Sequence, residues 1–83
     1  MTRSEQIEKW FLRSWIKART SEAVYLNIRG YNVSVFERSE NCWSNRILER
    51  GHPINDATFE NNFPNERAAK IAVLGRLADI LDI

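Results

Sequence analysis

Apolar and polar residues alternate most regularly in two neighbouring stretches, Val24 to Ile28 and Tyr31 to Phe36. A period of two is typical of β-strands that bury one face. If Arg29-Gly30 is a two-residue turn, Ile28 pairs with Tyr31, and the apolar residues of both strands share a face. The pattern therefore predicts an antiparallel hairpin whose buried face carries Val24, Leu26, Ile28, Tyr31, Val33 and Val35.

A third strand is predicted from Cys42 to Arg50, ended by Gly51-His52-Pro53. Trp43 and Ile47 lie on one of its faces and Cys42 and Leu48 on the other, so its facing stays open. A short fourth strand near residues 58–59 is a further possibility.

Helices are predicted before and after these strands. Thr2 and Glu5 have the spacing of a capping box, and the helix that they begin is expected to end at Thr20 and Ser21. The last helix is expected to start at Asn65, a favourable N-cap residue. The expected fold class is α+β, one domain over residues 1–83, as an α-β-β-β-α chain. Its three-stranded antiparallel meander has the helices packed on one face.

Charge and cysteine content bear on the kind of partner and on the cellular location. The chain has a net charge of +1, yet its first 19 residues hold five basic and two acidic side chains, and its last 30 hold three basic and five acidic. This asymmetry can steer an anionic partner or draw the two ends together. The single cysteine, and the lack of a long apolar run or a signal-peptide pattern, predict a cytoplasmic protein without membrane contact.

The residue types used in catalysis and metal binding are sparse. Cys42, His52 and Asp56 (or Asn55) could form a nucleophile, base and orienting group. However, Cys42 and His52 lie on the order of 25–30 Å apart along one strand at ~3.3 Å per residue. One cysteine and one histidine do not fill a zinc site, and the glycines are isolated. We therefore expect no enzymatic activity, no cofactor and no metal.

Two surfaces are candidates for a protein partner. The outer sheet face would carry Tyr25, Phe36 and, in one facing of its strand, Trp43. The alternative interpretation is that these rings only shield a small sheet. On the first helix, Leu12 and Ile16 fall outside the apolar stripe, so a second contact is expected there. Small residues at Ala68, Ala72 and Gly75 offer another close approach. Either helix surface would suit a homo-oligomer.

A basic stripe gives the alternative. Lys9, Arg13 and Lys17 recur every four residues, a spacing that would align three cations along a helix. Such a row can follow the phosphates of a nucleic acid, or it can be an ordinary solvated face.

The order α-β-β-β-α, with Arg67-Ala68-Ala69-Lys70 opening the last helix, resembles the double-stranded-RNA-binding domain. In that family, lysines at this helix start bind phosphates across the major groove, so the resemblance implies phosphate contacts for Arg67 and Lys70. The family's minor-groove loop of Gly-Pro-x-His type is here only Arg29-Gly30. The resemblance therefore concerns topology, and fold alone does not fix function.

These observations favour a small macromolecule-binding or accessory module whose partner is a protein. Nucleic-acid binding through the basic residues Lys9, Arg13, Lys17, Arg67 and Lys70 is the second hypothesis.

Overall fold

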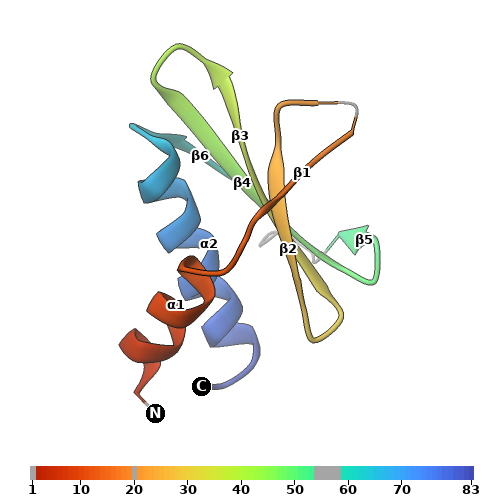
Figure 1. Ribbon diagram of the computed structural model, residues 1–83, viewed down its shortest axis with the longest axis vertical. Helices are drawn as coiled ribbons and strands as arrows, with labels where there is room; N and C mark the ends of the chain where they lie inside the picture. Colours follow the sequence, from red (N-terminus) through yellow and green to blue (C-terminus); the bar gives the residue numbers. More distant parts are fainter. Residues whose placement is uncertain (1, 20, 54–58) are drawn as a thin grey trace.

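A computed structural model describes residues 2–19, 21–53 and 59–83 of the chain. It is an α+β protein with an antiparallel sheet and two helices (Figure 1). The described elements are α1 (Arg3–Phe11), β1 (Ile16–Lys17), β2 (Val24–Ile28), β3 (Tyr31–Ser39), β4 (Cys42–Glu49), β5 (His52–Pro53), β6 (Phe59–Phe63) and α2 (Glu66–Ile80).

The predicted hairpin is confirmed. β2 and β3 are antiparallel, and Ile28 pairs with Tyr31 across the turn. Arg29 and Gly30 both have positive φ, 50° and 87°. Two such residues define the turn whose twist matches that of the flanking strands. The turn thus sets the register that brings the apolar residues of both strands to one face.

The third predicted strand is β4, and its pairing fixes the facing that the sequence leaves open. Val33 pairs with Ile47 and Glu37 with Trp43. Because paired residues share a face, Trp43 and Ile47 point to the buried side. Trp43 packs against the core there, so of the two facings left open the buried one is observed, and Trp43 is not part of the outer-face candidate surface.

The sheet is larger than a three-stranded meander. Among the described residues the sheet has six strands: five follow the order β1-β2-β3-β4-β5, and the sixth, β6, also pairs with β4. β5 pairs with the end of β4 through Glu49 and His52, and β6 with its beginning through Trp43 and Phe63. The expected fourth strand corresponds to β6, although residue 58 lies outside the described part.

The first helix is shorter than predicted. The capping box of Thr2 and Glu5 is present, but α1 ends at Phe11. The Trp15 indole Nε1 donates a hydrogen bond to the Phe11 carbonyl at 3.1 Å, and Ile16 then pairs with Tyr25 as part of β1. Aromatic and β-branched residues favour strands, and the open edge of β2 supplies hydrogen bonds. The predicted end of this helix at Thr20 lies outside the described residues.

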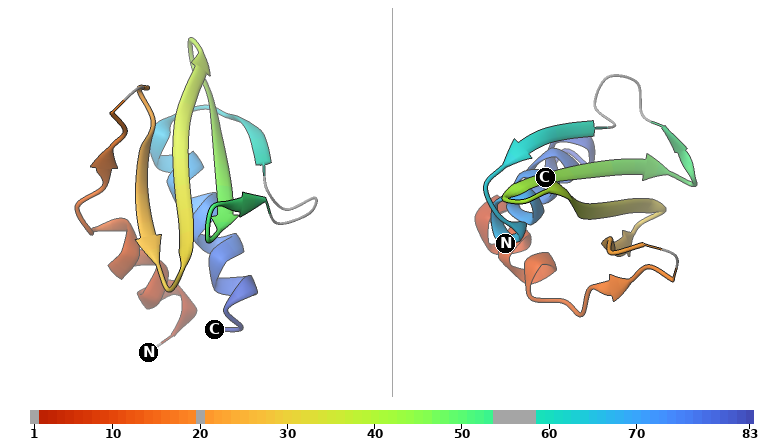
Figure 2. Two further views of the ribbon diagram at one scale, coloured as in Figure 1. Left: turned by 90° about the vertical axis from the view of Figure 1, so that its right-hand side faces the viewer. Right: turned by 90° about the horizontal axis from the view of Figure 1, so that it is seen from above.

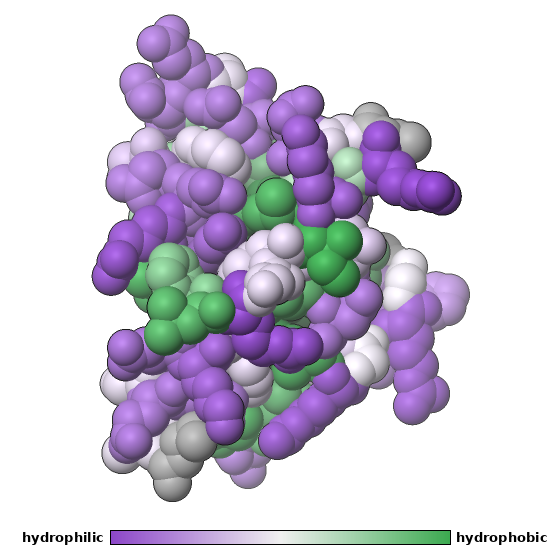
Figure 3. All heavy atoms as spheres, in the orientation of Figure 1, coloured by the Kyte–Doolittle hydropathy of each residue, from purple (hydrophilic) through white to green (hydrophobic). Residues whose placement is uncertain are grey.

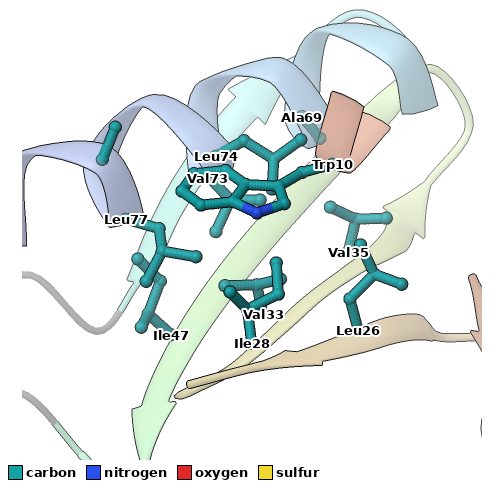
Figure 4. Packing of buried hydrophobic residues seen from close by; sticks show 11 residues of the cluster. Trp10, Leu26, Ile28, Val33, Val35, Ile47, Ala69, Val73, Leu74 and Leu77 are labelled. Carbon is teal, nitrogen blue, oxygen red and sulfur yellow. The ribbon is translucent and has the colours of Figure 1, made fainter. Parts of the chain in front are cut away.

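Helix α2 covers one face of the sheet and packs on β3 and β4, while α1 packs beside α2 (Figures 1 and 2). The indole of Trp10 reaches from α1 in among the side chains of α2 and the sheet (Figure 4). The buried core consists of Trp10, Leu26, Ile28, Val33, Val35, Ile47, Ala69, Val73, Leu74, Leu77 and Ala78.

One buried polar residue joins the sheet to α2. Asn45 in β4 is fully buried, and its Nδ2 donates a hydrogen bond to the Ala69 carbonyl at 3.0 Å. Its Oδ1 accepts a hydrogen bond from the Arg76 guanidinium. Both ends of the amide are therefore satisfied, as burial requires.

The helices run antiparallel. Arg3 forms an ion pair with Asp79, and its guanidinium donates to the Gly75 carbonyl at 3.0 Å. The basic start and acidic end of the chain thus meet within the molecule through Arg3, Gly75 and Asp79. The predicted close approach at the small residues Ala68, Ala72 and Gly75 stays a prediction, since a Cβ at Gly75 would meet nothing within 4 Å. In the part of the chain described, no helix is long and apolar enough to cross a membrane.

Candidate protein-docking groove

A groove of about 490 Å³ lies between α1 and α2 on the side away from the sheet. Successive turns of α1 form one wall, and the first turns of α2 form the other. Figure 3 shows hydrophobic surface at the C-terminal end of α1 with hydrophilic side chains around it. The residues that line this docking groove are Ser4, Ile7, Glu8, Phe11, Leu12, Arg67 and Ile71.

Two aliphatic side chains of the groove remain in solvent. Leu12, the C-cap residue of α1, is 72% exposed, and Ile71 of α2 is 40% exposed. Complete burial of such a side chain contributes roughly 1.5–3 kcal/mol. Covering both from their present exposure would therefore contribute about 2–3 kcal/mol to binding.

Cations lie over the aromatic rings at one end of the groove. The Arg67 guanidinium is 5.4 Å from the centre of the Phe11 ring, and Lys70 Nζ is 4.8 Å from that of Trp15. Lys70 also forms an ion pair with Glu66 at 3.3 Å, and its side chain is only 16% exposed. Arg67 is thus the more accessible of the two cations implied by the resemblance to RNA-binding domains.

Arg67 and Glu8 are the charged residues that line the groove. Within the described residues, neither Arg67 nor the exposed Arg13 next to Leu12 has an acidic partner. Glu8 lies further along the same wall. At the start of α1, hydrogen bonds from the Thr2 side chain and then its backbone lower the pKa of Glu5 below its ordinary value of 4.5. This carboxylate belongs to the helix cap.

The predicted basic helix stripe was wrong. Lys9 lies in α1, Arg13 follows the end of that helix, and Lys17 lies in β1. Lys17 also forms an ion pair with Glu22 at 3.7 Å. Because α1 ends before the second of these residues, the three cations do not follow one helix face.

Leu12 and Ile16 belong to different surfaces. Leu12 lines the groove, whereas Ile16 pairs with Tyr25 and shares the outer sheet face with it. Ile16 is 48% exposed there, and Tyr25 and Phe36 are half-buried. Leu12 and Ile16, which the longer predicted helix placed on one surface, therefore lie on two separate surfaces.

Cys42 and His52 are far apart, as expected. Cys42 begins β4, with its Sγ 3.7 Å from the Asn62 Oδ1, and His52 pairs with Glu49 at the other end of the strand. The predicted third members of this group, Asp56 and Asn55, lie outside the described residues.

Several groove residues were missed in the sequence. Ile7, Phe11 and Ile71 lie at helical spacing from other apolar residues, a pattern that indicates core-facing positions, and Glu8 shows no signal of its own. An available signal was the width of the apolar arc on the last helix, which exceeds what one sheet face covers. Ile71 lies at the edge of that arc, where a second helix leaves it partly uncovered.

No protein-family model matches the chain, and comparison with curated proteins and with solved structures likewise finds no match.

Proposed function

We propose that this protein is a non-enzymatic protein-binding module whose docking groove receives an amphipathic helix of a partner protein. The observation that carries the proposal is the exposure of Leu12 and Ile71 in one groove between two helices. Exposed aliphatic side chains in a concave surface, bordered by charge, are typical of interaction sites.

The shape of the groove supports a helix as the bound element. Its long wall is a helix face with residues spaced by three and four, from Ser4 to Leu12. Such ridges pack well against the ridges of another helix. In helix-in-groove recognition, the bound helix presents apolar anchors at positions i, i+3 or i+4, and i+7.

The charges support an acidic partner. Arg67 lines the groove and has no acidic partner within the described residues. Arg13, which follows Leu12 in the chain, has none there either. A carboxylate on the rim of the bound helix would meet Arg67 while the apolar anchors cover Leu12. Such pairs mainly affect orientation and association rate, and the apolar contact supplies the affinity.

A second copy of the chain fits the groove less well. The groove wall formed by α1 is short, because α1 has nine residues and spans roughly 13 Å at 1.5 Å per residue. Standard interfaces bury roughly 800 Å² on each partner, and obligate homodimers bury more. The other large exposed hydrophobic residues described, Ile16 and Ile83, do not line the groove. The small apolar area suits a short helical segment of a different protein.

The nucleic-acid alternative has less support. Lys9, Arg13 and Lys17 are distributed over three segments, and Lys70 is largely buried against Trp15 and Glu66. Lys9, Arg13 and Lys17 therefore do not form the single helical row on which this alternative depended.

The test is selection of binders from a displayed library of random helical 16-residue peptides on the immobilised protein. We expect the selected peptides to carry three apolar anchors at helical spacing and at least one acidic residue. Leu12→Glu and Ile71→Glu should each weaken their binding roughly tenfold or more. Titration calorimetry measures this change.

The matched controls are Ile83→Glu and Ile16→Glu, because these side chains are exposed to 37% and 48% outside the groove. Both variants should bind the peptides as the parent protein does. Selection of no helical binders, or loss of binding in Ile16→Glu but not in Leu12→Glu, would overturn the proposal. Concentration-dependent dimerisation abolished by Leu12→Glu would assign the groove to a second copy instead.

A further inference from the structure

The two charged side chains of the docking groove lie on different walls and have opposite signs. Glu8 belongs to the α1 wall and Arg67 to the α2 wall. Both residues are exposed, and within the described part of the chain neither forms an ion pair. A helix bound between the walls therefore meets a negative charge along one flank and a positive charge along the other.

Arg67 is held at the groove by an aromatic ring. Its guanidinium lies 5.4 Å from the centre of the Phe11 ring, which also lines the groove. An arginine whose face rests on a ring can still bind a carboxylate with two hydrogen bonds in the plane of its guanidinium. Lys70, the other cation near this ring, is paired with Glu66 and only 16% exposed. Arg67 is therefore the cation placed to bind an acidic side chain of the partner.

Glu8 has no basic neighbour on its own helix face. Residues three and four positions apart are neighbours on a helix surface, and for Glu8 these are Ser4, Glu5, Phe11 and Leu12. The Glu8 carboxylate thus borders the apolar surface of Leu12 without a cation of α1 beside it. A basic side chain on the flank of the bound helix would supply that cation.

We propose that the docking groove selects a partner helix with charges of opposite sign on the two flanks of its apolar stripe. This inference rests on the proposed function and adds the charge pattern of the partner. The flank that faces α2 carries an aspartate or glutamate that binds Arg67, and the flank that faces α1 carries a lysine or arginine that binds Glu8. The anchors between the flanks cover Leu12 and Ile71. In coiled coils, ion pairs beside the apolar seam likewise set partner choice and orientation.

The test starts from the peptides selected on the immobilised protein, whose sequences should carry an acidic and a basic residue on opposite sides of the anchors. Each of these two charges is then replaced by glutamine, and all peptides are titrated into the parent protein and its variants by calorimetry. We expect Arg67→Gln to weaken the parent peptide roughly three- to tenfold, but not the peptide that lacks its acidic residue. Glu8→Gln should cost roughly two- to fivefold, and only for peptides that keep the basic residue.

Arg29→Gln and Glu40→Gln are the matched controls, because both side chains are exposed in turns of the sheet and should leave the affinity unchanged. Selected peptides without opposite charges on their flanks would overturn the inference. Equal effects of Arg67→Gln and Glu8→Gln on charged and neutralised peptides would also overturn it. If Leu12→Glu still weakens binding in that case, only the charge pattern fails and the docking groove stands. Failure of the groove itself would instead appear as unchanged binding in Leu12→Glu.

Discussion

Asn45 is the residue through which β4 and α2 are hydrogen-bonded to each other. Its amide donates to the Ala69 carbonyl and accepts from Arg76 in a fully buried position. Asn45→Ala removes both bonds and leaves a small cavity. We expect the free energy of unfolding to fall by about 2–3 kcal/mol, measured by urea denaturation.

The control for this prediction is Asn32→Ala. Asn32 donates to Asn27 Oδ1 at 3.0 Å on the outer sheet face, where water can replace the bond. Its loss should change stability by at most about 0.5 kcal/mol. Equal effects of the two substitutions would show that Asn45 has no special role in joining the layers.

Glu5 makes the start of α1 sensitive to pH. Hydrogen bonds from Thr2 lower the pKa of Glu5 below 4.5, so the carboxylate stabilises the folded state above that pH. This contribution is lost as the pH falls through the lower folded-state pKa. The stability of the parent protein relative to Glu5→Gln should therefore be greater at pH 7 than at pH 3, measured by urea unfolding. A difference independent of pH would contradict this role.

At the residue level, the sequence predicted hydrogen bonds between near neighbours in the chain better than it predicted which side chains are buried. The capping box of Thr2 and Glu5 depends on a spacing of three residues and is present. The facing of Trp43 depends on pairing with β3, which local pattern does not determine. The role of Asn45 was not predicted, because an asparagine in a strand does not reveal whether a helix carbonyl covers it.

Among the elements, two turns share one sequence and one geometry. Arg29-Gly30 joins β2 to β3, and Arg50-Gly51 joins β4 to β5, with φ values of 50° and 87° in the first and 50° and 84° in the second. Recognition of the first turn predicted its register. The second Arg-Gly pair was the signal for β5, but it was interpreted only as the end of a strand.

The turn geometry predicts the effects of substitution. A Cβ at Gly30 would meet only the Arg50 side chain, at 3.9 Å, so Gly30→Ala is opposed by its positive φ and not by crowding. We expect the free energy of unfolding to fall by about 1–2 kcal/mol, measured by thermal unfolding.

Arg29→Asn should instead stabilise the protein by about 0.5 kcal/mol, because asparagine adopts positive φ more readily.

Gly51→Ala is the matched comparison for Gly30→Ala. Its backbone is equally unfavourable for alanine, but it precedes a strand of only two residues. Local opening of β5 can relieve the strain, so its effect on global stability should be smaller. A larger loss in Gly51→Ala would contradict the view that β2 and β3 are central to the fold.

The end of α1 illustrates why element boundaries were harder to predict. Ile7, Phe11 and Trp15 continue a helical spacing past the point where the helix stops. Pairing of Ile16 with Tyr25 at the sheet edge competes with another helical turn, and the tertiary contact prevails. A short segment with both patterns takes the structure that its neighbours stabilise.

At the scale of the whole molecule, the proposal predicts a monomer in the absence of a partner. The exposed apolar side chains of the groove are few, and a partner of different sequence is expected to cover them. Sedimentation should give a single species of 9.7 kDa at concentrations up to about 100 μM. Self-association through a small apolar patch is weak, with a dissociation constant on the order of millimolar, so dimers should not form in this range. A stable dimer at micromolar concentration would contradict this prediction.

The α+β class and the central hairpin were predictable because the turn and the apolar pattern agree. The docking groove was not, because it depends on how α1 lies beside α2. Leu12 was identified as a surplus apolar residue, but its neighbours Arg67 and Ile71 are separated from it by more than fifty positions in the sequence.

The most direct test of the docking groove is titration of a selected acidic amphipathic peptide into the isotopically labelled protein, followed by backbone amide NMR. We predict chemical-shift changes concentrated around Ser4, Ile7, Glu8, Phe11, Leu12, Arg67 and Ile71, with the outer sheet face unaffected. Changes centred on Ile16, Tyr25 and Phe36, or none in the groove at saturation, would contradict the account.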